Sequence, residues 1–138
     1  MVSRAYFSYC QLYARFPEYL MLGEALRPPD VDCAIIEIPL AGTVQGRPTS
    51  RPPQKTPGAR FPAVNVGGFR AADGSVATVL ANTTEKPQIA KLSVAIAVSN
   101  PTLYDAQRRE LQQWNSVPAG QAVRIELEPF GTRILIDG

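Results

Sequence analysis

Alternation of apolar and charged residues near the end of the chain restricts the possible folds most strongly. The apolar positions are Val123, Ile125 and Leu127, with Arg124, Glu126 and Glu128 between them. A period of two residues indicates a β-strand that buries one face and exposes the other. Residues 129–131, Pro-Phe-Gly, predict a turn into a second strand, in which Ile134 and Ile136 face the same way. The chain is therefore expected to close with an antiparallel hairpin.

The preceding part of the chain predicts further strands. Residues 64–70 and 75–82 form two of them, joined by the turn signal Asp73-Gly74, and the second is apolar on both faces, as in a central strand. A third strand is expected at residues 89–96. Its inward residues are expected to be Ala90, Leu92, Val94 and Ile96. Residues 104–114 fit either a helix or a strand, and their strand neighbours favour the strand. Short strands separated by frequent turns predict a mainly β fold, an antiparallel β-sandwich or jelly roll.

One helix is predicted before these strands, over residues 4–22. Its stripe at three- and four-residue spacing consists of Tyr6, Tyr9, Cys10, Tyr13, Phe16 and Leu20. Pro17 should kink or end the helix near Phe16. More than half of the aromatic residues of the chain lie in this short piece. Two interpretations stay open: a core helix packed across the sheet, or a helix with a second apolar face that contacts a larger body.

Residues 33–40 predict a first strand between the helix and the other strands. Ile36, Ile38 and Leu40 are expected to point inward. Pro39 places this strand at the edge of a sheet or marks its end, because proline cannot donate a ladder hydrogen bond.

Residues 41–62 have a different composition, rich in Pro and Gly, with four basic residues and no acidic one. A solvated loop is the favoured interpretation, with phosphate binding as the alternative. Proteolysis is expected first after Arg47, Arg51, Lys55 or Arg60. The chain is thus divided into a helical segment at 1–32 and a β-sandwich at 33–138 that carries the loop at 41–62.

Chemical groups for catalysis are scarce. The chain has no histidine, and so lacks the commonest general base and metal ligand. Cys10 and Cys33 are expected to be two buried free thiols rather than a disulfide. Asp30-Val31-Asp32 reads as a surface turn rather than calcium ligands, and Asn82-Thr83-Thr84 matches a glycosylation pattern that often arises by chance. The sequence predicts no catalytic residue, metal or cofactor, and identifies no binding residue.

Charge and hydropathy exclude two classes of partner. A formal net charge of +2 is too small to indicate nucleic-acid binding. No stretch approaches the ~18 apolar residues that a membrane span needs. The first residues lack the pattern of a secretory signal, and the location in the cell is left open.

Four segments resemble the C-terminal end of TIM-barrel glycoside hydrolases. Residues 69–82 are similar to a segment of the β-sandwich that follows the barrel, in which an aromatic residue and Asp-Gly lead into an apolar strand ending in Asn. Residues 118–120 and 129–131 resemble the final hairpin of that sandwich. Residues 13–29 resemble the last barrel helix and its exit. Phe69 stands where Trp is frequent in the family, and the loop at 41–62 has no counterpart.

The resemblance implies a non-catalytic accessory β-sandwich of a carbohydrate-active enzyme, packed against a catalytic barrel that is missing from this chain. The two carboxylates of such enzymes lie at barrel strand ends, and no such pair is recognised here, so the chain alone is not expected to be an enzyme. The alternative is a stand-alone carbohydrate- or protein-binding module that uses Trp114 or Tyr104 for stacking, although core packing is favoured for both. A truncated small enzyme is the least supported. Self-association through the N-terminal helix is also expected.

Overall fold

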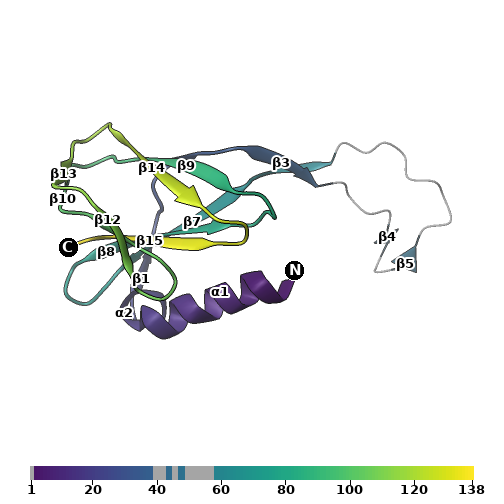
Figure 1. Cartoon of the computed structure of the whole chain (residues 1–138), viewed down its shortest axis with the longest axis horizontal. Coiled ribbons are helices and arrows are strands. Elements are labelled where there is room, and N and C mark those ends of the chain that lie inside the picture. The colour runs from purple at the N-terminus through teal and green to yellow at the C-terminus, as the bar shows by residue number, and fades with distance from the viewer. Residues whose placement is uncertain (1, 39–42, 45–46, 49–57) are drawn as a thin grey trace.

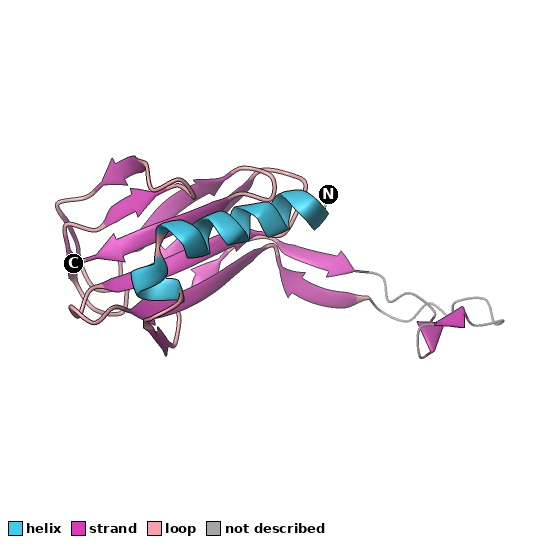
Figure 2. Ribbon diagram, turned by 90° about the horizontal axis from the view of Figure 1, so that it is seen from below, coloured by secondary structure: helices cyan, strands magenta, loops and turns pink. Residues whose placement is uncertain are grey.

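The computed structural model describes residues 2–38, 43–44, 47–48 and 58–138, with side chains for residues 7–37 and 58–138. Its main body has three layers, formed by helix α1 (Val2–Arg15), a six-stranded sheet and a three-stranded sheet (Figures 1 and 2). The mainly β, antiparallel sandwich with a leading helix is therefore confirmed.

The six-stranded sheet forms the middle layer. In spatial order its strands are β1 (Glu24–Leu26), β7 (Val64–Arg70), β8 (Val76–Asn82), β15 (Thr132–Asp137), β11 (Thr102–Tyr104) and β12 (Glu110–Gln113). All neighbours are antiparallel. The predicted Asp73-Gly74 turn joins β7 to β8, and Gly74 has a φ of 90°, which glycine adopts without strain. The central place predicted for residues 75–82 is confirmed.

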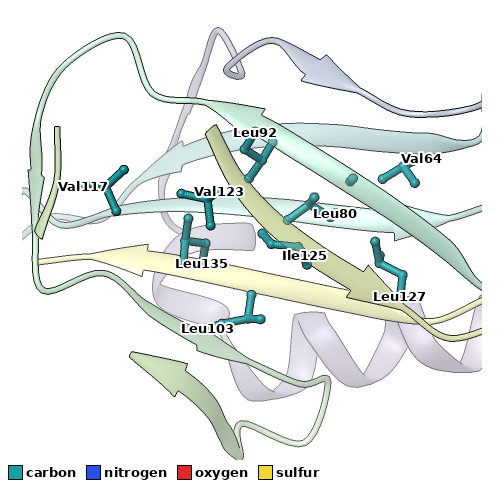
Figure 3. Packing of buried hydrophobic residues seen from close by; sticks show 10 residues of the cluster. Val64, Leu80, Leu92, Leu103, Val117, Val123, Ile125, Leu127 and Leu135 are labelled. Carbon is teal, nitrogen blue, oxygen red and sulfur yellow. The ribbon is translucent and has the colours of Figure 1, made fainter. Parts of the chain in front are cut away.

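The three-stranded sheet covers one face of the six-stranded sheet. It consists of β14 (Ala122–Leu127), β9 (Gln88–Ser93) and β2 (Val31–Asp32). The core between the sheets contains Val64, Leu80, Ala90, Leu92, Leu103, Val117, Val123, Ile125, Leu127 and Leu135 (Figure 3). Burial of each Val, Leu or Ile side chain contributes about 1.5–3 kcal/mol before the entropy cost of ordering it. The alternation in residues 122–127 supplies one wall of this core, as predicted.

The prediction of a closing hairpin is wrong. Pro129-Phe130-Gly131 does turn the chain, but β14 pairs with β9, whereas β15 pairs with β8 and β11. The turn therefore carries the chain from one sheet to the other. Leu135 faces the core with Ile125, while Ile134, which is fully buried, packs in the cluster beneath α1. A turn signal predicts a reversal but does not identify the strand that will pair.

The break in the helical segment predicted at Pro17 is confirmed. Helix α1 ends at Arg15, and α2 (Pro17–Leu20) starts with Pro17 in its first turn, where a missing N–H costs nothing. The cluster between the helices and the six-stranded sheet contains Leu12, Phe16, Tyr19, Ala71, Ala77, Ala106 and Ile134. Three alanines leave room for the Phe16 ring, which is fully buried.

The predicted helical stripe is only partly correct, because Phe16 is fully buried and Leu20 packs against the cluster beneath the helices, whereas other members are exposed. The helix places Ser8 and Leu12 towards the sheet, and the Ser8 hydroxyl lies 2.9 Å from the Thr132 hydroxyl. Cys10 and Tyr13, two members of the predicted stripe, are exposed. The stripe is therefore divided: Phe16 is buried against the sheet, whereas Tyr13 remains in water.

A two-stranded ribbon extends from the main body, as Figure 2 shows. It pairs β3 (Ile35–Ile38) with β6 (Ala59–Pro62). The first strand thus joins neither sandwich sheet, Ile35 is exposed, and Ile36 is half-buried. This corrects the inward strand expected at 33–40, whose Leu40 lies outside the described residues.

The loop expected at 41–62 is also corrected at its end, because residues 59–62 form β6. Two short strands within it, β4 (Thr43–Val44) and β5 (Arg47–Pro48), pair with each other. Arg51 and Lys55 lie outside the described residues.

Two other predictions change in detail. Strand β9 ends at Ser93, and Ile96 is 78% exposed rather than inward. Residues 104–114 contain the turn from β11 to β12 instead of one strand. The remaining pair is β10 (Val98–Ser99) with β13 (Ser116–Val117). Neither described helix is long and apolar enough to span a membrane.

Candidate binding surface

The outward side of α1 carries exposed apolar residues. Phe7, Cys10 and Tyr13 follow one another at intervals of three, which places them on the half of the helix that faces away from the sheet. Phe7 is 63% exposed and Tyr13 is 50% exposed. Met21 and Leu22, in the turn after α2, are even more exposed. We call these five residues the helix surface.

A groove of about 420 Å³ runs beside the helix surface, between α1 and the β7–β8 part of the sheet. Its lining consists of Tyr9, Leu12, Tyr13, Leu20, Asn65, Val66, Gly67, Phe69, Val79 and Ala81. Three aromatic rings therefore border one concavity, and the exposed amide of Asn65 offers hydrogen bonds at its edge. A Cβ atom at Gly67 would lie 3.2 Å from the Phe69 ring, so glycine leaves that ring its place.

Arg108 fixes the two helices to the turn between β11 and β12. Its guanidinium lies 2.6 Å from Glu18 Oε1, donates to the Arg15 carbonyl at 2.7 Å, and sits 4.8 Å from the centre of the Phe16 ring. Partial burial would raise the pKa of Glu18, but the hydrogen bond and charge of Arg108 outweigh it and lower that pKa. A cation near the last carbonyls of a helix also suits the helix dipole.

The two aromatic residues proposed for sugar stacking are partly buried. Tyr104 packs edge-on against Phe16, with ring centres 6.0 Å apart. Trp114 packs against the core between the sheets. Core packing, the favoured interpretation, therefore accounts for both residues better than an exposed platform does.

A second concavity, of about 460 Å³, lies on the other flank of α1 and is polar. Most of its groups already bond one another: Gln107 donates to Gln11 at 2.9 Å, and Arg109 pairs with Asp105 at 2.9 Å. Asp105 also accepts the backbone N–H groups of the turn that follows it. These contacts hold the β11–β12 turn against the helix.

The sequence motifs with possible chemistry stay apart. Asp30 and Asp32 are both exposed, and the described residues contain no cluster of three acidic, cysteine or histidine side chains that could hold a metal. Cys10 and Cys33 are free thiols, but Cys10 is exposed and Cys33 half-buried, which corrects the expectation that both are buried.

Asn82 is structural. It is 1% exposed, donates to the carbonyls of Lys86 at 2.7 Å and Glu128 at 2.9 Å, and accepts the Thr84 backbone N–H at 2.9 Å. The glycosylation pattern at 82–84 is therefore enclosed in the folded chain. The Asn82 side chain thus bonds the turn at which its strand ends.

Neither a protein-family model nor a curated protein matches the chain. A solved structure with a similar backbone is that of a proposed alpha-N-acetylgalactosaminidase from Bacillus halodurans C-125, at a TM-score of 0.45 and 15% sequence identity. The alignment covers 58% of this chain and 18% of that one, so this chain spans less than a fifth of that protein. Similarity at this level supports no inference about function.

Proposed function

We propose that the chain is a non-catalytic accessory β-sandwich of a carbohydrate-active enzyme, which docks on a catalytic barrel through its N-terminal helix. The observation that carries the proposal is the two-sided use of α1. One side of the helix packs on the six-stranded sheet through Leu12, while the other side leaves Phe7 and Tyr13 in water.

Burial against a second body would explain these exposed rings. Each Phe or Tyr buries roughly 150–250 Å² on full contact, so the pair offers a substantial apolar contact. The sequence resemblance supplies the identity of that body, because it relates residues 13–29 to a barrel's last helix.

The test is co-expression with a barrel encoded in frame with, or directly upstream of, this chain. The unaltered chain is expected to co-purify with the barrel, and Phe7→Ser with Tyr13→Ser should reduce recovery at least tenfold. Ile89→Ser is the matched control, since Ile89 is 46% exposed but lies in β9, in the layer away from α1. Genomes without an adjacent barrel gene, or equal recovery of all three proteins, would contradict the proposal.

Hydrolysis gives a second check. The isolated chain should release no product from a panel of aryl glycosides, because a glycosidase needs two carboxylates placed on either side of the bond. Turnover that persists through purification and disappears when a single Asp or Glu is replaced would make the chain an enzyme.

The groove supports a second candidate, a stand-alone carbohydrate-binding module. Tyr9, Tyr13 and Phe69 offer aromatic surface for the C–H faces of a sugar ring, and Asn65 can bond a hydroxyl. Titration with soluble oligosaccharides, followed by tyrosine fluorescence, separates this candidate from the first. Saturable binding of an oligosaccharide that Tyr9→Ala removes would favour the module, if the chain also does not bind the barrel.

A further inference from the structure

A third concavity lies at the open end of the sandwich and, at about 800 Å³, is larger than the two described above. It enters between the two sheets. Leu92 of β9 and Leu135 of β15 line it, and both belong to the core between the sheets. Pro28 and Pro29, in the segment that connects β1 to β2, form part of its border. We call it the end cleft.

The walls of the end cleft are aliphatic. Val76, Val94 and Val98 contribute side chains, and no aromatic residue lines it. Ala95, Ile96 and Ala97 border it in the loop after β9, where all three are exposed. An alkyl chain fits such walls better than a flat ring, because there is no aromatic face on which a ring could stack.

Charged groups border the same cleft. They are Asp137, Asp30 and Arg27. Asp137 is half-buried, and none of the ion pairs among the described residues includes it. Its burial raises the pKa of its carboxyl, which means that the ionised form lacks compensation there. Arg27 and Asp30 are exposed, so water solvates both.

We propose that the end cleft binds a single-chain aliphatic amphiphile with an ammonium head. The alkyl chain lies on Leu92 and Leu135, and the ammonium group lies beside Asp137. Two carboxylates against one guanidinium give the cleft a net negative charge, which favours a cationic head over an anionic one. The ammonium would supply the counter-charge that Asp137 lacks, and the tail would remove the aliphatic walls from water.

The test uses octylammonium, octyl sulfate and tetramethylammonium, each below its aggregation concentration, with the unaltered full chain. Calorimetry should show one octylammonium per chain, at least tenfold weaker binding of octyl sulfate, and no detectable binding of tetramethylammonium. In methyl NMR spectra, Leu92 and Leu135 should shift on addition of octylammonium. Equal affinity for octyl sulfate, shifts confined to residues elsewhere, or no binding at all would overturn the proposal.

Asp137→Asn tests the head group, with Glu85→Gln as the matched control at an exposed carboxylate in the turn after β8. Asp137→Asn should weaken octylammonium binding at least tenfold and leave the protein as heat-stable as before or more so, because the amide removes an uncompensated charge. Glu85→Gln should change neither quantity. Unchanged binding by Asp137→Asn overturns the role of Asp137. Should that variant fail to fold, the affinity ratio and the methyl shifts of the unaltered chain decide.

Discussion

Asn82 shows how one polar residue can organise a sandwich. Its amide stands at the end of β8 and bonds two separate turns, one after β8 and one after β14. The second turn carries the chain from the three-stranded to the six-stranded sheet. An amide suits this position, because it donates to two carbonyls and accepts from an N–H at once.

Asn82→Ala should therefore lower the free energy of unfolding by about 2–4 kcal/mol, since three part-buried backbone groups lose their partners. Urea denaturation followed by circular dichroism measures the change. Asn65→Ala is the matched control, because Asn65 is exposed on β7. It should cost no more than ~0.5 kcal/mol. Equal losses in the two variants would show that the Asn82 bonds contribute little.

Glu18 gives a pH-dependent contribution. Because the fold lowers its pKa, the stabilisation is present above the pKa of the unfolded carboxyl and is lost as the pH falls through the lower, folded value. Both partners are more than a third exposed, so Glu18→Gln should cost only about 0.5 kcal/mol at pH 7. The cost should disappear as the pH falls through the lowered, folded pKa, because protonation removes the charge that pairs with Arg108. In an Arg108→Gln background the same change should have no effect at pH 7; a persisting cost would assign it to another contact.

The elements show which parts of the fold a sequence can reveal. Local patterns predicted β7, β8, β9 and β14, the turn at Gly74 and the break at Pro17, because each depends on residues close in the chain. Pairing could not be predicted in the same way. β15 is buried on both faces, and only the assembled sheets determine that Leu135 meets Ile125 while Ile134 meets the helix.

The groove could not be predicted either, because residues far apart in the sequence form it. The groove joins Tyr9 and Tyr13 of the helix to Asn65 and Phe69 of β7, residues separated by more than fifty positions. The crowded aromatics were visible in the sequence, and Phe7 and Tyr13 are exposed. That this side of the helix contacts a larger body stays a prediction. The side of α1 that packs could not be predicted, because the alanines in the cluster beneath it (Ala71, Ala77 and Ala106) come from later parts of the chain.

The helix surface should give the isolated chain a tendency to bind apolar molecules. We expect it to bind an apolar dye or to self-associate, since two rings and two long aliphatic side chains stand in water. Phe7→Ser with Tyr13→Ser should reduce dye fluorescence severalfold, whereas Ile89→Ser should not. Sedimentation velocity at several concentrations checks association. A monomeric chain that does not bind the dye would contradict this prediction.

At the scale of the whole molecule, the helical segment and the sandwich share one structure. Residues before position 33 contribute α1 to one layer, β1 to the six-stranded sheet and β2 to the three-stranded sheet. That residues 1–32 correspond to the end of a barrel stays a prediction. In the structure, α1, β1 and β2 pack on or pair with elements of residues 33–138.

A chain reduced to residues 33–138 should therefore not fold cooperatively. It would expose Ile134 and Ala77, leave β7 and β9 without their edge partners, and lose the Phe16 ring from the core. A loss of about 3–5 kcal/mol is expected from Phe16 alone. Thermal unfolding compares this truncation with the full chain. A sharp transition in the truncated chain would show that the sandwich is an independent unit.

The place of β15 also sets an order of events during synthesis. β15 follows every other described strand in the sequence, yet it lies in the middle of its sheet, with β8 on one side and β11 on the other. Until residue 137 has been synthesised, no strand lies between the pairs β7–β8 and β11–β12. Both pairs then expose apolar side chains to water. Such an interval favours chaperone binding and aggregation. Slow translation of the last strand would therefore lower the yield of this protein more than slow translation of its helix.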